Sequence, residues 1–258
     1  MKKSIKMIVT DLDDTLLRSE KYISDYTIEI LKKCQSVGIK IVFATARSVQ
    51  ATSRYLEQFT PDILVSYGGA LVVAGDTVIH RFDIPADISY QLISECLQAT
   101  EISSIHAINE SVALTNNLSD LAVSDSSHYR EYDFSKRNNM SYLKISVVSF
   151  VPEVVERIAA NYSMLDMLRY TNEDLYRFAC HDAVKWNAVK AVAEYYDIDI
   201  DLFVAFGDDV NDIDMVHYCG IGVAVSNAVD AVKAVADDIC DTNDNDGVAK
   251  WIEDNILL

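Results

Sequence analysis

The chain has 258 residues, half of them hydrophobic, which is enough for one large or two modest domains with a substantial core. Its formal charge of −18, from 40 acidic and 22 basic side chains, disfavours nucleic acid and anionic membranes as partners. No apolar run approaches the about 20 residues that span a bilayer, and no signal-peptide core follows Met1, so we expect a cytoplasmic protein.

The first third of the chain alternates between strand-type and helix-type patterns. The expected elements are a strand at 5–10, a helix at 24–36, a strand at 39–44, a helix at 49–58 and a strand at 63–66. This alternation predicts parallel strands with crossover helices, and Ser24 and Gly38 are suited to start and stop the first helix. Residues 67–82 then predict a β-hairpin that turns at 74–76.

The rhythm breaks between residues 83 and 182. The elements expected there are a helix at 86–100, strands at 104–108 and 112–115, a polar stretch ending at 138–139, a strand at 142–150, a helix at 152–162, and strands at 164–171 and 175–180. This order is typical of a separate α+β domain.

The first rhythm then returns. Helices are expected at 184–196, 213–218 and 229–236, and strands at 202–206, 220–225 and 239–240. We therefore expect an α/β fold: a doubly wound, Rossmann-like parallel sheet formed by residues 1–82 and 183–258, with an α+β domain of residues 83–182 inserted into it.

Acidic residues follow two of the predicted buried strands. Asp11 and Asp13 come after the first strand, and Asp208, Asp209 and Asp212 follow the strand at 202–206. The carboxyl ends of parallel strands meet at one edge, where two like charges about 4 Å apart repel by roughly 4 kcal/mol. A divalent cation would remove this repulsion, and Mg²⁺ suits oxygen ligands that also face phosphate. Asp11, the main-chain carbonyl of Asp13, and Asp208 are its expected protein ligands.

These residue types can support phosphoryl transfer. Asp11 can attack phosphorus to form an aspartyl-phosphate, while Asp13 can protonate the leaving oxygen and later activate water. Thr45, after the second strand, would offer a hydroxyl, and Lys185 would bring a positive charge to the phosphate. Asp212 would orient that lysine or a metal-bound water, and Asn211 would hydrogen-bond a phosphoryl oxygen.

Together these motifs resemble those of a known enzyme family. D-x-D-x-T at 11–15, Thr45, Lys185 and G-D-x-x-N-D at 207–212 are similar to the four motifs of the haloacid dehalogenase superfamily of phosphatases. The insert resembles the large α/β cap of its Cof-type branch. That branch's C-terminal signature is matched by Met215, Asn227-Ala228, Ala236-Asp237 and Asp246-Gly247-Val248-Ala249.

The resemblance implies a Mg²⁺-dependent phosphatase for small phosphate monoesters such as sugar phosphates. Asp11 would be the nucleophile and Asp13 the acid/base. The metal would lie among Asp11, Asp13, Asp208 and Asp212. The substrate phosphate would lie near Thr45, Ala46, Arg47, Lys185 and Asn211. Ala46 and Trp186 stand where the family usually has glycine, so a methyl at 46 and an indole at 186 would narrow the space near the phosphate or the cap hinge. Gly68 stands where the family usually has asparagine.

Several other polar residues permit a structural interpretation. We expect Asp14 in an exposed turn, Asp209 either near the metal or in solvent, and Arg47 either at the substrate phosphate or paired with an acid on its own helix. His181 suits a hinge or a helix cap, and Trp186 suits packing. Residues 128–132 with Lys136-Arg137 would contact the substrate or form a solvated loop. The five scattered cysteines, without C-x-x-C spacing, are expected to be reduced packing residues.

Three alternatives remain at this point. A receiver domain also clusters Asp, Thr and Lys around Mg²⁺, but its phosphoacceptor follows the third strand and its chain is about half as long. A non-catalytic module that binds a phosphorylated metabolite and a phosphomutase are the others. The expected partner is a small phosphorylated metabolite, and the protein is expected to be a monomer or homodimer.

Overall fold

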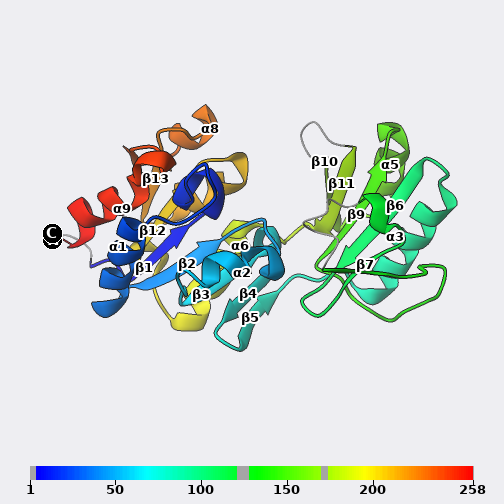
Figure 1. Ribbon diagram of the computed structural model, residues 1–258, viewed down its shortest axis with the longest axis horizontal. Coiled ribbons are helices and arrows are strands. Elements are labelled where there is room, and N and C mark those ends of the chain that lie inside the picture. The colour runs from blue at the N-terminus through cyan, green and yellow to red at the C-terminus, as the bar shows by residue number, and fades with distance from the viewer. Residues whose placement is uncertain (1–3, 121–127, 170–173, 258) are drawn as a thin grey trace. The chain divides into compact units, whose positions relative to one another are not determined.

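The computed structural model describes residues 4–120, 128–169 and 174–257 and divides the chain into two compact units (Figure 1). The first unit comprises the chain up to Arg81 and from Val184 onward, and the second runs from Phe82 to Ala183. Each unit has its own sheet and its own hydrophobic core.

The first unit is built on an eight-stranded sheet in the order β14-β13-β12-β1-β2-β3-β4-β5. Neighbours from β14 to β3 are parallel, and β4 and β5 are antiparallel additions at one edge. The strands are β1 (Met7–Thr10), β2 (Lys40–Ala44), β3 (Ile63–Ser66), β4 (Leu71–Ala74), β5 (Thr77–Arg81), β12 (Phe203–Gly207), β13 (Ile221–Val225) and β14 (Asp238–Cys240). The predicted doubly wound α/β fold is confirmed.

Helices and short helical turns connect these strands. The helices are α1 (Asp25–Ser36), α2 (Val49–Leu56), α6 (Lys185–Tyr196), α7 (Ile213–Tyr218), α8 (Asp230–Lys233) and α9 (Gly247–Ile252). The turns are η1 (Leu12–Leu16), η2 (Tyr67–Gly69), η4 (Ile200–Leu202), η5 (Val210–Asp212), η6 (Asn243–Asn245) and η7 (Glu253–Leu257). The Ser24 side chain accepts the Thr27 N–H at 3.1 Å, so the predicted cap of α1 is confirmed.

The central strand explains why the apolar runs in this sequence are continuous. Met7, Ile8 and Val9 of β1 are all fully buried, although neighbouring side chains of a strand point to opposite faces. Both faces of the sheet are therefore covered, as parallel sheets require.

The second unit has a six-stranded sheet in the order β10-β11-β9-β6-β7-β8. Its strands are β6 (Ile102–Ile108), β7 (Ala113–Thr115), β8 (Tyr129–Glu131), β9 (Lys144–Ser149), β10 (Leu165–Arg169) and β11 (Leu175–Cys180). Helices α3 (Ala86–Gln98) and α5 (Pro152–Ala159) contact each other and lie along this sheet, and η3 spans Leu118–Asp120 (Figure 1). Residues 121–127 of the predicted polar stretch and 170–171 of a predicted strand lie outside the described residues.

Among the helices that the structure describes, none is both long enough and apolar enough to cross a membrane.

Candidate active site

Three adjacent parallel strands of the first unit end side by side. In the central strand β1, Thr10 pairs with Phe206 of β12 on one side and with Phe43 of β2 on the other. Asp11, Asp208 and Thr45 follow these strands directly and therefore lie at one edge of the sheet. The sequence-based expectation that residues far apart in the chain meet at this edge agrees with the geometry.

Lys185 lies between two carboxylates at this edge. Its Nζ is 2.5 Å from Oδ1 of Asp11 and 2.6 Å from Oδ1 of Asp212. All three side chains are buried, with 5% or less of each residue exposed. Burial alone would lower the pKa of Lys185, but the charges of Asp11 and Asp212 outweigh it and hold that pKa above its ordinary value. Lys185 is therefore a fixed positive charge beside Asp11.

Asp212 also orders the loop that carries Asp208. Its Oδ2 accepts the backbone N–H of Asp208 at 3.1 Å and that of Asp209 at 3.2 Å. The preceding Gly207 makes room for this side chain, since a Cβ there would lie 2.3 Å from the Cβ of Asp212. Asp212 thus positions both the loop and Lys185.

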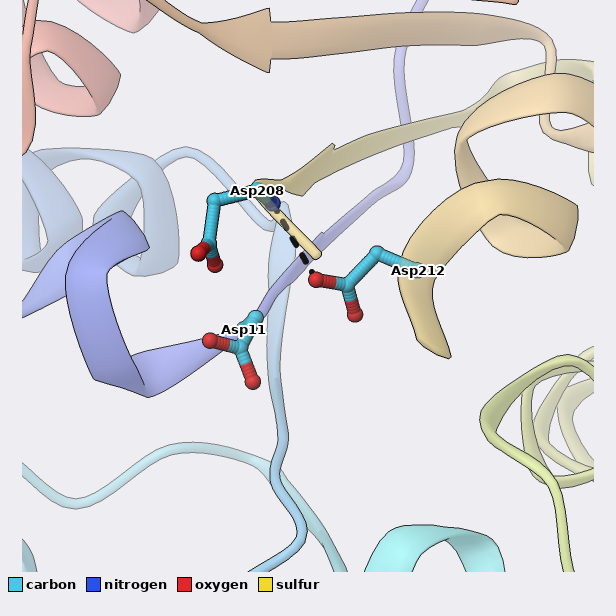
Figure 2. A group of neighbouring side chains, drawn as sticks. All are labelled: Asp11, Asp208 and Asp212. Carbon is cyan, nitrogen blue, oxygen red and sulfur yellow. Dashed lines mark hydrogen bonds between the residues drawn. The ribbon is translucent and has the colours of Figure 1, made fainter. Parts of the chain in front are cut away.

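Asp11, Asp208 and Asp212 form an acidic cluster, and Figure 2 shows their carboxylates side by side. One oxygen of each lies within 4.8 Å of one oxygen of the others. Burial, with smaller contributions from neighbouring carboxylates, raises the pKa of Asp208 to about 6 and raises that of Asp11 well above its ordinary value. Three carboxylates against one lysine leave excess negative charge, and this all-oxygen donor set fits a hard divalent cation.

Asp13 does not belong to this acidic cluster, and two cations bind its carboxylate. Arg47 makes a two-pronged contact, with Nε 2.6 Å from Oδ2 and a terminal nitrogen 2.6 Å from Oδ1. Lys21 Nζ is 3.3 Å from Oδ1. Burial would raise the pKa of Asp13, but the pairing with Arg47 and then Lys21 lowers it. The acid that binds Arg47 therefore comes from the turn after β1, and an acid on the arginine's own helix was the wrong expectation.

Thr45 is buried, although its hydroxyl was expected to be offered at the site, whereas the neighbouring Ala46 is exposed. Thr45 is 1% exposed, and its hydroxyl accepts the Arg47 N–H at 3.1 Å. It is absent from the described lining of the pocket, whereas the exposed Ala46 belongs to it. This pocket encloses about 160 Å³ and is lined by Asp11, Asp13, Asp14, Ala46, Lys185, Asp208, Asp209, Asn211 and Asp212.

The remaining predicted residues have the following environments. Asp14 is in an exposed turn with φ +57° and pairs with Lys21 at 2.9 Å. The side chain of Asp209 accepts the Val210 N–H at 2.8 Å and so caps η5. His181 is exposed and lies 2.9 Å from Asp166, and Trp186 packs against the core and Tyr218.

Two residues near the site had no assigned role in the sequence interpretation. Thr15 donates its hydroxyl to Oδ1 of Asp208 at 2.6 Å, and its place in D-x-D-x-T was the available signal. Lys21 does not follow a strand end, so no signal in the sequence marked it. The conformation of its loop brings it to Asp13.

Residues 8–252 match the family model of the haloacid dehalogenase-like hydrolases. The chain belongs to the haloacid dehalogenase-like hydrolases. The predicted resemblance is thereby confirmed, and this hydrolase is an enzyme of the phosphatase type rather than a receiver domain or a non-catalytic module.

Two curated relatives come from Bacillus subtilis (strain 168). The 5-amino-6-(5-phospho-D-ribitylamino)uracil phosphatase YitU is 28% identical over 276 residues, covering 98% of this hydrolase and 98% of the relative. The putative phosphatase YkrA is 26% identical over 262 residues, again covering 98% of each chain. A haloacid dehalogenase-like hydrolase from Bacteroides thetaiotaomicron, solved by crystallography, superposes with a TM-score of 0.83 at 26% identity, covering 97% of this hydrolase and 99% of that chain.

Proposed function

We propose that the protein is a Mg²⁺-dependent phosphatase that hydrolyses small phosphate monoesters through an aspartyl-phosphate at Asp11. The observation that carries this proposal is the buried contact of Asp11 with Lys185, 2.5 Å apart, at the edge where Asp208 and Asp212 converge. A carboxylate in this position is oriented and lies beside a fixed positive charge, which favours attack on a phosphoryl group.

The first step is assigned to Asp11. Lys185 holds Oδ1 of Asp11, and the other carboxylate oxygen attacks phosphorus while the ester oxygen leaves with its electron pair. Lys185 stabilises the negative charge on the transferring group. We assign Asn211 and the backbone N–H of Ala46 as donors to phosphoryl oxygens, because both residues line the pocket.

Asp13 is assigned the proton transfers. Its pairing with Arg47 keeps it ionised in the free protein, which is the form that accepts a proton from attacking water in the second step. To protonate the leaving oxygen in the first step, Asp13 must gain a proton when substrate binds. A shift of Arg47 from Asp13 toward the dianionic phosphate would raise the pKa of Asp13 in the required direction.

The Mg²⁺ ligands are assigned to Asp11 and Asp208, with Asp212 and the main-chain carbonyl of Asp13 as further expected oxygen donors. When bound, the ion supplies positive charge that neutralises the phosphoryl oxygens. Thr15 and Asp212 support the site by orienting Asp208 and its loop.

We infer small phosphorylated metabolites, sugar or ribityl phosphates among them, as the substrate class. The name of the relative YitU includes a phosphorylated ribityl compound, and the relative matches this chain over nearly its whole length. Residues 128–132, Lys136 and Arg137 remain the predicted specificity group, and the cytoplasmic location and monomeric or dimeric state also remain predictions.

The test is phosphate release from p-nitrophenyl phosphate and a panel of sugar phosphates, with Mg²⁺ and with a chelator. We expect turnover that the chelator abolishes and added Mg²⁺ restores. Equal turnover under both conditions would reject the metal role. Transfer of the phosphoryl group to another position of the sugar, with no free phosphate, would favour the phosphomutase instead.

A further inference from the structure

We propose that Lys21 contacts the leaving group of the substrate and selects phosphate esters that carry a second anionic group close to the ester. This inference rests on the proposed function, because it uses Asp13 as the group that protonates the leaving oxygen.

Lys21 is held at the site by an ordered loop. Its backbone N–H donates to the carbonyl of Arg18 at 2.7 Å, and the residue adopts φ +60°. The Arg18 guanidinium binds both carboxylate oxygens of Asp246, and Ser19 donates twice to Asp244 at 2.7 Å. The loop is thereby tied to the turn around η6, and Lys21 is presented toward Asp13 and Asp14.

The distance to Asp13 places Lys21 near the leaving group. A general acid must approach the leaving oxygen to about 3 Å. Because Lys21 Nζ is 3.3 Å from Oδ1 of Asp13, it can reach substituents two or three bonds beyond the ester oxygen. In the free protein Arg47 occupies both oxygens of Asp13, so Lys21 is not needed there to hold that carboxylate.

The present partner of Lys21 is easily replaced. Its closest contact, 2.9 Å, is with Asp14, whose side chain is 54% exposed. Ion pairs at such exposed positions contribute little free energy, so exchanging Asp14 for an anion on the substrate costs little.

The charge of the pocket explains why such a cation matters. Its described lining holds six carboxylates and a single cation, Lys185, which is committed to Asp11 and Asp212. A leaving group with a carboxylate or a second phosphate would be repelled at this opening. Lys21, beside Asp13, is placed to offset that repulsion.

The test compares two esters of similar size, phosphoglycerate with its carboxylate and glycerol phosphate without one. We expect Lys21→Met to lower the ratio of their kcat/KM values, phosphoglycerate over glycerol phosphate, at least about tenfold, since a hydrogen bond to a charged group contributes this much. Lys21→Arg should largely restore the ratio. Lys33→Met is the matched control, because Lys33 pairs with the exposed Glu29 on α1 and should leave the ratio as in the wild type.

A ratio within about twofold of wild type in Lys21→Met would overturn the proposal, as would an equal change in Lys33→Met. Calorimetric binding of both esters to Asp11→Asn, with and without Lys21→Met, gives a second measurement that needs no turnover. Loss of the preference for phosphoglycerate in the double variant supports the role of Lys21, and equal affinities with and without Lys21 contradict it. The proposed function fails separately, if the wild type releases no phosphate from any ester.

Discussion

At the scale of single residues, the site depends on burying a lysine with two carboxylates. Removing a charge from water costs several kcal/mol unless it is paired, and both partners of Lys185 lie within 2.6 Å. The sequence suggested that Lys185 brings a positive charge to the phosphate, and it suggested Asp212 as the residue that orients this lysine or a metal-bound water. It did not indicate that Asp13 is bound by Arg47 and Lys21, because these contacts depend on loop conformations that no periodicity encodes.

A substitution at Gly207 tests whether the position of Asp212 matters for stability and turnover. In Gly207→Ala the added Cβ would overlap Asp212, so the side chain must move from the Asp208 and Asp209 N–H groups. We expect a loss of about 1–3 kcal/mol in the free energy of unfolding and a fall in turnover of at least tenfold, on the order of one positioning contact. Urea unfolding and phosphate release measure the two effects.

Gly38→Ala is the control for this substitution. Gly38 has φ +85° and open space around it, so alanine there costs stability by backbone strain alone. Turnover should be unaffected, since Gly38 lies at the end of α1. If Gly207→Ala retains full turnover, the positioning role of Asp212 is wrong.

At the scale of elements, buried strands and helices were the most predictable parts of the fold. The structure gives β3 (Ile63–Ser66), β11 (Leu175–Cys180) and α7 (Ile213–Tyr218) the bounds expected from the sequence. β3 has every residue buried, so its hydrophobic run alone defines it. β8 was missed because its three residues are partly or fully exposed. Among the described strands it pairs with β7 alone, so it forms through tertiary contact and not from its own sequence pattern.

The turn η2 was expected to be the start of a hairpin strand. Instead Gly69, at φ +112°, packs against the backbone of Val184 and Lys185, with no space for a Cβ. A close approach of two backbones leaves no periodic signal in the sequence. The close approach explains why residue 69 is a glycine.

β6 of the second unit carries a buried histidine. His106 is 3% exposed, and its Nε2 lies 3.1 Å from the hydroxyl of Ser104. Burial lowers the pKa of His106 to about 4. The folded state therefore disfavours the protonated imidazole, while the unfolded chain protonates near pH 6.5.

We expect the second unit to lose stability as the pH falls from about 6.5 to about 4, where the unfolded state binds more protons than the folded state. Over this whole pH range the shifted pKa of His106 lowers the free energy of unfolding by roughly 3 kcal/mol. Urea unfolding of wild type and His106→Leu over this range checks it. The variant should show a smaller loss on acidification, and identical pH slopes would contradict the assignment.

At the scale of the whole molecule, the net charge of −18 and the acidic cluster both favour the binding of a cation. Asp208 has its pKa raised to about 6, so the metal-free folded protein binds more protons than the unfolded chain between about pH 4 and 6. The contribution of this group to stability therefore falls as the pH rises through 6, because a buried carboxylate must then ionise, with Asp212 as a neighbouring negative charge.

Mg²⁺ should reverse this loss. At a hundredfold excess over its Kd, an ion that binds only the folded state adds about 2.7 kcal/mol. We expect Mg²⁺ to raise the Tm at neutral pH and to raise it less near pH 5, where Asp208 is protonated. In Asp208→Asn we expect no rise. Calorimetry measures these Tm values, and an equal rise in the variant would place the ion elsewhere.

The organisation of the chain could largely be foreseen at this scale, whereas the environments of individual loops could not. The return of the strand and helix rhythm near residue 184 follows from hydrophobic patterning, which local sequence encodes. Burial of Thr45 and exposure of Ala46 depend on how the loop after β2 packs.

Whether Asp11 forms a covalent bond to phosphorus is tested most directly by phosphate release from Asp11→Asn in the presence of Mg²⁺. We expect this variant to fold correctly, with its circular dichroism spectrum retained, and its turnover to fall at least about a thousandfold. Turnover within tenfold of wild type would contradict this role of Asp11.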